Sequence, residues 1–248
     1  MAGRIPAGTT MIRIAQAKMI WHKISPLRAV ASVFGVYAGL LGMEHGYFET
    51  LQGSVAPHGV RILASRSELP FPFGHEPALT VVPNFLLTGV LAILCGLSVL
   101  IWAAGFVQKK HGGGILFLLS IILLFVGGGF GPMTLLITAS IAGTRINMPL
   151  TWWRSHLSAN LRRLLAKSWP WFFLFALLWV PAEFIVGHIF GVKNDPSLTL
   201  ANLNLILSYP LLGFFLLALV TGIAGEIDRR ADFPQAASMS GSPASLEA

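Results

Sequence analysis

Two pairs of acidic and imidazole side chains interrupt long apolar segments of this chain. Glu44 and His45 lie near the end of one segment, and Glu183 and His188 lie in another segment after Pro181. An ionisable side chain inside a bilayer costs about 2.5–3.5 kcal/mol on insertion scales, so each one needs a function or a partner. Carboxylates and imidazoles bind protons and cations, and they are also ligands of transition metals. We therefore predict that these four residues form a shared polar site.

The spacing within each pair restricts the metal interpretation. Glu44 and His45 are about 100° apart around a helix, and the second pair is about 140° apart. Neither pair has the i, i+4 spacing at which two ligands of one helix meet, and no HExxH motif occurs. A metal would have to be held between helices, with His45 and His188 as its candidate ligands. In the structural alternative, Glu44, His45 and Glu49 lie at the water interface, and Glu183 is a buried acid with a neighbouring His or Asn partner.

The composition places these residues in a membrane. The 248 residues are 54% hydrophobic and only 11% charged, whereas a soluble domain carries about 25% charged residues. The apolar segments are long and continuous, which predicts an all-α, multi-pass helical integral membrane protein rather than a β-barrel. The net charge of +7 comes from Lys and Arg at the ends of apolar segments. This placement is typical of loops that face anionic lipid headgroups, not of a nucleic-acid-binding surface.

One transmembrane domain is predicted over residues 27–226. A basic cytoplasmic segment, 1–26, precedes it, and a disordered cytoplasmic tail, 227–248, follows it. In chain order the expected elements are spans at 27–46 and 78–107, a broken hairpin at 115–143, an interfacial helix at 150–168, and spans at 169–190 and 198–224.

The uncharged stretch at 112–144 is broken in its middle by the sequence GGGFGP at 127–132. Gly and Pro oppose helix propagation, and they fill five of these six positions. The arms at 115–126 and 133–142 reach about 18 and 15 Å, against about 30 Å of bilayer hydrocarbon. The stretch therefore predicts a hairpin, either as a re-entrant loop or as two short spans. The break is either a plain turn or a backbone site for ions or substrate; its residues are Gly127, Gly128, Gly129, Gly131 and Pro132.

The distribution of Lys and Arg favours the hairpin. If the stretch crossed the membrane once, the basic residues 145–167 would lie outside, against the positive-inside rule. A hairpin places these residues and both termini in the cytoplasm, in a plasma membrane or a prokaryotic inner membrane. Residues 150–168 have one apolar helical face, and their basic side chains are expected to contact anionic headgroups. These side chains are Arg154, Arg162, Arg163 and Lys167.

Small residues recur every four positions in the first span, at Ala31, Gly35 and Gly39. Such a stripe lets another helix approach closely. We expect it to be a packing surface, with a homo-oligomer as the candidate assembly.

Three functions fit these features. The first is a small transporter or channel-like protein in which Glu183 carries a proton or cation, assisted by His188, Glu44 or His45. The second is a membrane-embedded metalloenzyme that uses the same residues. The third is a non-catalytic assembly or anchoring subunit that uses the basic helix as its contact surface. The sequence contains no GxSxG or Walker motif, and it specifies neither a catalytic residue nor a cofactor.

Overall fold

Helices form most of the chain that this computed structural model describes, which is residues 24–63, 77–189 and 200–240. In chain order they are α2 (Pro26–Leu51), α3 (Phe85–Gly105), α4 (Gly112–Phe125), α5 (Phe130–Arg145), α6 (Thr151–His156), α7 (Ala159–Ile189) and α8 (Leu200–Ser240). Two short antiparallel strands, β1 (Arg61–Leu63) and β2 (Pro77–Leu79), pair between α2 and α3 with Ile62 opposite Ala78. The predicted helical class is confirmed, and the strand pair was not predicted.

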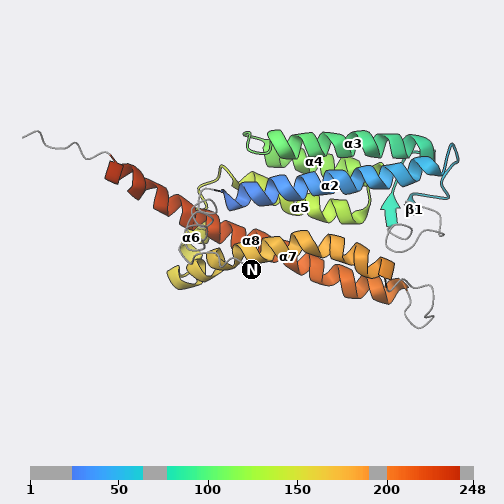
Figure 1. Cartoon of the computed structure of the whole chain (residues 1–248). Helices are drawn as coiled ribbons and strands as arrows, with labels where there is room; N and C mark the ends of the chain where they lie inside the picture. Colours follow the sequence, from blue (N-terminus) through green and yellow to red (C-terminus); the bar gives the residue numbers. More distant parts are fainter. Residues whose placement is uncertain (1–23, 64–76, 190–199, 241–248) are drawn as a thin grey trace, which may run out of the picture.

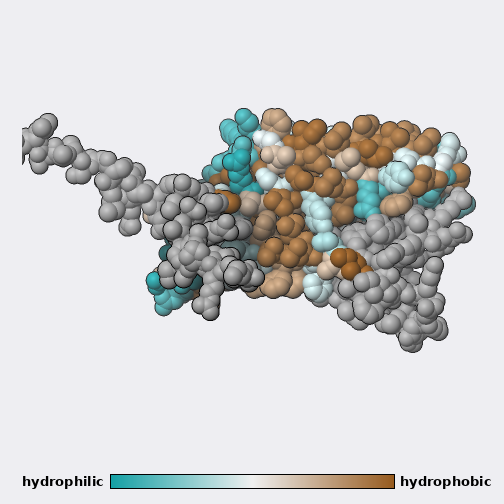
Figure 2. Space-filling model, in the orientation of Figure 1, coloured by the Kyte–Doolittle hydropathy of each residue, from teal (hydrophilic) through white to brown (hydrophobic). Residues whose placement is uncertain are grey.

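Three of these helical segments have the length and apolar character that a membrane crossing requires. They are Pro26–Leu51, Phe85–Gly105 and Leu211–Ala231 within α8. Large apolar side chains such as Leu94, Ile101 and Leu216 remain exposed on them, and Figure 2 shows a broad hydrophobic area across the middle of the face in view. A continuous apolar surface of this kind suits lipid rather than water. The membrane character that the composition predicted is therefore supported.

The helices are arranged as two groups (Figure 1). The first contains α2, α3, α4 and α5, and the second is the pair α7 and α8, which lies against the first half of α2. Three aromatic rings join the groups: the ring centroid of Phe34 on α2 is 5.5 Å from that of Phe173 and 5.3 Å from that of Phe215. Phe34 and Phe215 are fully buried, so the main apolar core lies at this junction.

The small-residue stripe of α2 packs against α3. A Cβ atom on Gly39 would lie 2.7 Å from the carbonyl oxygen of Gly96, and a Cβ on Gly96 would lie 2.7 Å from that of Gly39. A Cβ atom on Gly35 would lie 2.5 Å from the Cβ of Ala103, and Ala31 is buried. The stripe does bring two backbones together, as small residues allow. Its partner at Gly35 and Gly39 is a helix of the same chain, α3. The candidate homo-oligomer stays a prediction.

The basic region differs from the prediction. Instead of one interfacial helix at 150–168 and a separate span at 169–190, α6 ends at His156 and α7 runs without interruption from Ala159 to Ile189. Ser158 caps the N-terminus of α7, because its Oγ accepts a hydrogen bond from the Leu161 amide at 3.3 Å. Pro170 lies inside α7 and removes one donor without ending the helix. The predicted boundary at 168 is therefore wrong.

The last helix also extends beyond its predicted end. We expected a span ending near 224 and a disordered tail from 227, but α8 continues to Ser240. Two ion pairs accompany this extension: Arg230 pairs with Glu226 four residues earlier, and Asp228 pairs with Arg162 of α7. The predicted basic segment at 1–26 lies almost wholly outside the described residues, as do residues 241–248.

Candidate functional site

The break between α4 and α5 is shorter than predicted, and it lies against α2. Helix α4 ends at Phe125 and α5 begins at Phe130, so the predicted break residues Gly131 and Pro132 belong to the first turn of α5. A proline fits there because amides of the first helical turn have no intrahelical acceptor. Gly127 and Gly129 adopt positive φ angles of 96° and 82°, which glycine accepts without steric cost.

His45 and Glu49 are the side chains of α2 that meet the break. A Cβ on Gly127 would lie 2.6 Å from the carboxyl carbon of Glu49, and a Cβ on Gly129 would lie 2.5 Å from Cε1 of His45. The two side chains are four residues apart and share one face of α2. Both are buried, with 5% of His45 and 0% of Glu49 exposed. Glycine at 127 and 129 therefore provides both the backbone conformation and the space for these polar groups.

The carboxyl group of Glu49 has no compensating hydrogen bond. Neither of its oxygens has a partner among the residues that the structure describes. Removing a carboxylate from water without such bonds costs several kcal/mol or more. A proton or a bound cation at this position would offset the charge.

The segment between α2 and α3 also contacts the break, through main-chain hydrogen bonds. The Gly127 amide donates to the carbonyl of Leu79 at 2.8 Å, and the Val81 amide donates to the carbonyl of Phe125 at 3.0 Å. In the same segment, Thr80 is buried and its hydroxyl lies 2.9 Å from that of Thr88 on α3. Main-chain hydrogen bonds therefore fix the break, and α2 supplies the polar side chains.

Of the predicted site residues whose side chains the structure describes, His45 lies at the break. Glu44 precedes it on α2 and is only half-buried. The side chains of Glu183 and His188 lie outside those that the structure describes, so the predicted neighbourhood of α2 and α7 stays a prediction. Gly128 packs on Leu123 of α4 rather than on α2.

Glu49 is the residue whose importance the sequence analysis missed. Its i, i+4 spacing from His45 was present in the sequence as a signal. The structural alternative places Glu49 at a water interface because the predicted first span ends at residue 46, whereas α2 continues to Leu51 and Glu49 is buried. The metal prediction gains no support, because no group of three or more potential ligands from His, Cys, Asp and Glu occurs in the described part of the chain.

A second polar cluster lies at the other end of α2. Glu226 is fully buried and accepts hydrogen bonds from Ser25 Oγ at 2.6 Å, from Arg230 Nε at 2.9 Å and from Arg229. Arg230 also donates to the main-chain carbonyls of Ile146 and Met148. These bonds join the start of α2, the loop after α5 and α8. Because its carboxyl group is satisfied, this cluster is structural in character.

Basic side chains gather at this same end of the molecule, which Figure 2 shows as hydrophilic. Among the Lys and Arg side chains that the structure describes, Arg61 alone is at the end with the break. The others are Arg28, Lys109, Lys110, Arg145, Arg154, Arg162, Arg163, Lys167, Arg229 and Arg230.

Among the four predicted headgroup ligands, Arg162 forms an ion pair with Asp228 at 2.7 Å, and Arg163 donates a hydrogen bond to Asn160. Arg154 and Lys167 are exposed. The geometry is thus compatible with headgroup contacts, which remain predictions for all four side chains.

No protein-family model, curated protein or solved structure matches the chain. A function must therefore be derived from the geometry of its sites.

Proposed function

We propose that this chain is a multi-pass membrane protein of the small transporter or channel-like kind, in which Glu49 binds a proton or a small cation at the helix break. The observation that carries the proposal is a fully buried carboxyl group without a hydrogen-bond partner in the described structure, held against glycine-lined backbone. Broken helices whose free backbone groups line a polar site are the way many transporters bind ions within the membrane. His45 is the second polar side chain of this site.

The charge distribution supports an orientation. The basic end, with the start of α2 and the loops that precede α4 and follow α5, would face the cytoplasm. The break would then lie toward the outer surface, because His45 is about 28 Å further along α2 than Pro26. The 14 residues of α4 and the 16 of α5 reach about 21 and 24 Å, which favours two short crossings over a shallow re-entrant loop.

Glu49→Gln tests the proposal in proteoliposomes. Flux is measured with an internal pH dye under an imposed potential, and separately with Na⁺ and K⁺ gradients. We expect the substitution to abolish the flux that the wild-type protein shows, because glutamine exchanges no proton and carries no charge. Glu44→Gln is the matched control, since it makes the same change one residue before His45 at a half-buried position. That variant should keep most of the flux.

A carbodiimide that partitions into lipid gives a reading independent of transport, because it reacts with protonated carboxyl groups in apolar surroundings. Mass spectrometry should find Glu49 modified in the folded wild-type protein, and the cation that is carried should protect it. Unchanged flux in a folded Glu49→Gln variant would exclude Glu49 as the carrier. The alternative functions, a metalloenzyme and an assembly subunit, have no comparable observation among the described residues.

A further inference from the structure

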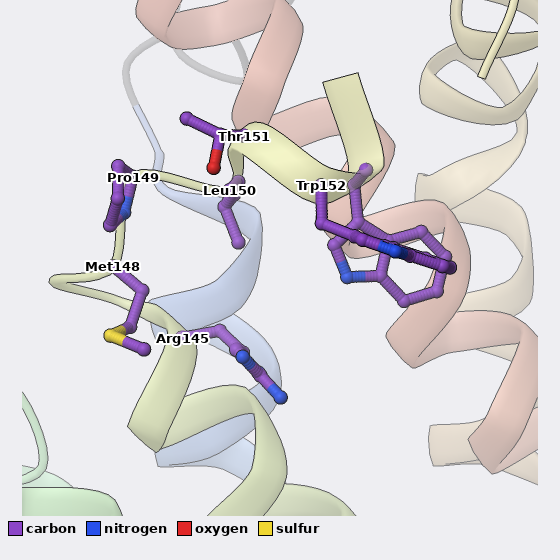
Figure 3. A pocket seen from close by; sticks show the side chains of 7 residues that line it. Arg145, Met148, Pro149, Leu150, Thr151 and Trp152 are labelled. Atoms are coloured by element: carbon purple, nitrogen blue, oxygen red, sulfur yellow. The ribbon is translucent and has the colours of Figure 1, made fainter. Parts of the chain in front are cut away.

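A cavity of about 310 Å³ lies at the basic end, between the last turn of α5, the loop that follows it and α6 (Figure 3). Its walls are mostly apolar and include Met148, Leu150, Trp152 and Trp153, and Arg145 also lines the cavity. This volume is at the lower end of the range of about 300–1,000 Å³ that is usual for small-molecule sites. The cavity therefore combines apolar walls with one cation.

The loop that forms this cavity is held in place without the side chain of Arg145. Leu150 is buried and adopts a left-handed conformation with a φ of 48°. The carbonyls of Ile146 and Met148 accept from Arg230, which the buried Glu226 anchors. The Asn147 side chain also donates to the carbonyl of Gln108 at 3.0 Å, which ties this loop to the loop before α4. The cavity is thus a fixed part of the fold.

Arg145 itself is not used in this framework. Its side chain is exposed, and it forms no hydrogen bond or ion pair with the residues that the structure describes. A guanidinium group binds a phosphate through two parallel hydrogen bonds. Tryptophan side chains favour the level of lipid headgroups, where their rings contact the first acyl carbons. An anionic head attached to an apolar body matches both halves of the lining.

We propose that this cavity binds one phospholipid of the cytoplasmic leaflet, with its phosphate on Arg145 and its glycerol and upper acyl carbons against Leu150 and Trp152. The inference depends on the membrane insertion proposed above but not on the site at Glu49. It differs from the general attraction of exposed basic side chains to lipid, because one side chain and one cavity define it.

Native mass spectrometry of the full-length protein in detergent tests the site. Phosphatidylglycerol, phosphatidylcholine with the same acyl chains, and glycerol 1-phosphate are titrated in parallel. We expect one phosphatidylglycerol to bind more tightly than phosphatidylcholine, and glycerol phosphate to bind weakly because it lacks the apolar part. Arg145→Gln should weaken phosphatidylglycerol binding by about tenfold, the usual value of a charge-assisted hydrogen bond.

Two further variants make the result specific. Arg28→Gln removes the same charge at another exposed position of the basic end, and it should change the affinity less than twofold. Met148→Trp fills the cavity while it keeps Arg145, and it should also weaken binding. Equal losses in Arg145→Gln and Arg28→Gln would contradict a defined site. Glycerol phosphate binding as tightly as the lipid would show that the cavity takes a free phosphate ester instead.

Discussion

Two glycines with nearly the same backbone conformation have different surroundings in this fold. Gly59 and Gly127 have φ angles of 97° and 96°, but a Cβ on Gly59 would meet nothing within 4 Å, whereas one on Gly127 would meet Glu49. Alanine in the left-handed region costs about 1–2 kcal/mol at either position. We predict that Gly127→Ala lowers the free energy of unfolding by about 1–3 kcal/mol more than Gly59→Ala, because it also overpacks the site.

Denaturant unfolding in detergent, followed by tryptophan fluorescence, measures this difference. The double variant Gly127→Ala/Glu49→Ala should recover part of the additional loss, since the group that alanine displaces is then absent. If Gly127→Ala and Gly59→Ala cost the same, the close approach to Glu49 is not a constraint on this position.

Two acidic residues of α8, Glu226 and Asp228, differ in burial, which predicts different effects on stability. Glu226 is fully buried with three donor side chains, whereas Asp228 and its partner Arg162 are partly exposed. Glu226→Gln should lower the free energy of unfolding by about 1.5–3 kcal/mol, because the buried carboxylate that accepts from two partly exposed arginines loses its charge. Asp228→Asn should lower it by less than about 1 kcal/mol.

The same denaturation assay checks this pair. A loss in Asp228→Asn that equals the loss in Glu226→Gln would mean that burial does not distinguish the two ion pairs.

At the scale of residues, the sequence indicated His45 as a candidate site residue, but it did not indicate that Glu49 is buried. The residue types and their spacing are local properties, and both could be recognised. Burial of Glu49 depends on which backbone approaches it, and that backbone belongs to residues 127–129, which are distant in sequence.

At the scale of elements, the contact between α2 and α3 depends on the absence of side chains. A Cβ on Gly96 would lie 2.7 Å from the carbonyl oxygen of Gly39, so Gly96→Ala must separate the two helices. We predict a loss of about 1–3 kcal/mol in the free energy of unfolding. Gly213 on α8 is the control, because a Cβ there meets nothing within 4 Å. Gly213→Ala should be neutral or stabilising by up to about 1 kcal/mol.

Both variants are compared in the same detergent. A neutral Gly96→Ala would show that the helices can separate at little cost, and the small-residue stripe would then not determine their distance.

Elements with strong local signals were predicted well, and those that depend on tertiary contacts were not. The span at 27–46 corresponds to α2, and the span at 78–107 contains α3, since continuous apolar runs and helix caps are local features. The predicted start at 78 is wrong, because residues 78–84 belong to β2 and the loop before α3. The division between α6 and α7 was missed because amphipathicity continues through residues 157 and 158. The helical end of α8 was missed because its charged residues pair with α7 and with one another.

At the scale of the whole molecule, the arrangement predicts which loops share a compartment. Cys95 is the only cysteine and is buried, so Cys95→Ala gives a background for single-cysteine labelling. Cysteines introduced at Lys110 and Arg154 should react with a membrane-impermeant maleimide from one side, and a cysteine at Gly59 from the other. Labelling of positions 59 and 154 from the same side would contradict the proposed topology.

The charge distribution predicts this layout, because insertion depends on Lys and Arg near the ends of apolar segments; the layout stays a prediction. The pairing of α7 and α8 against the start of α2 could not be read in the same way. It depends on the fit of Phe34 between Phe173 and Phe215, and each of these rings would be equally apolar in contact with lipid.

Main-chain hydrogen bonds from the loop hold the helix break, and this has a consequence for how the chain can evolve. The side chain of Val81 is 66% exposed, yet its amide is the donor to Phe125. Almost any amino acid supplies that amide. The side chain at position 81 can therefore change among descendants of this chain while the hydrogen bond to Phe125 is kept. Proline at position 81 would remove the donor, so we expect selection to exclude proline there.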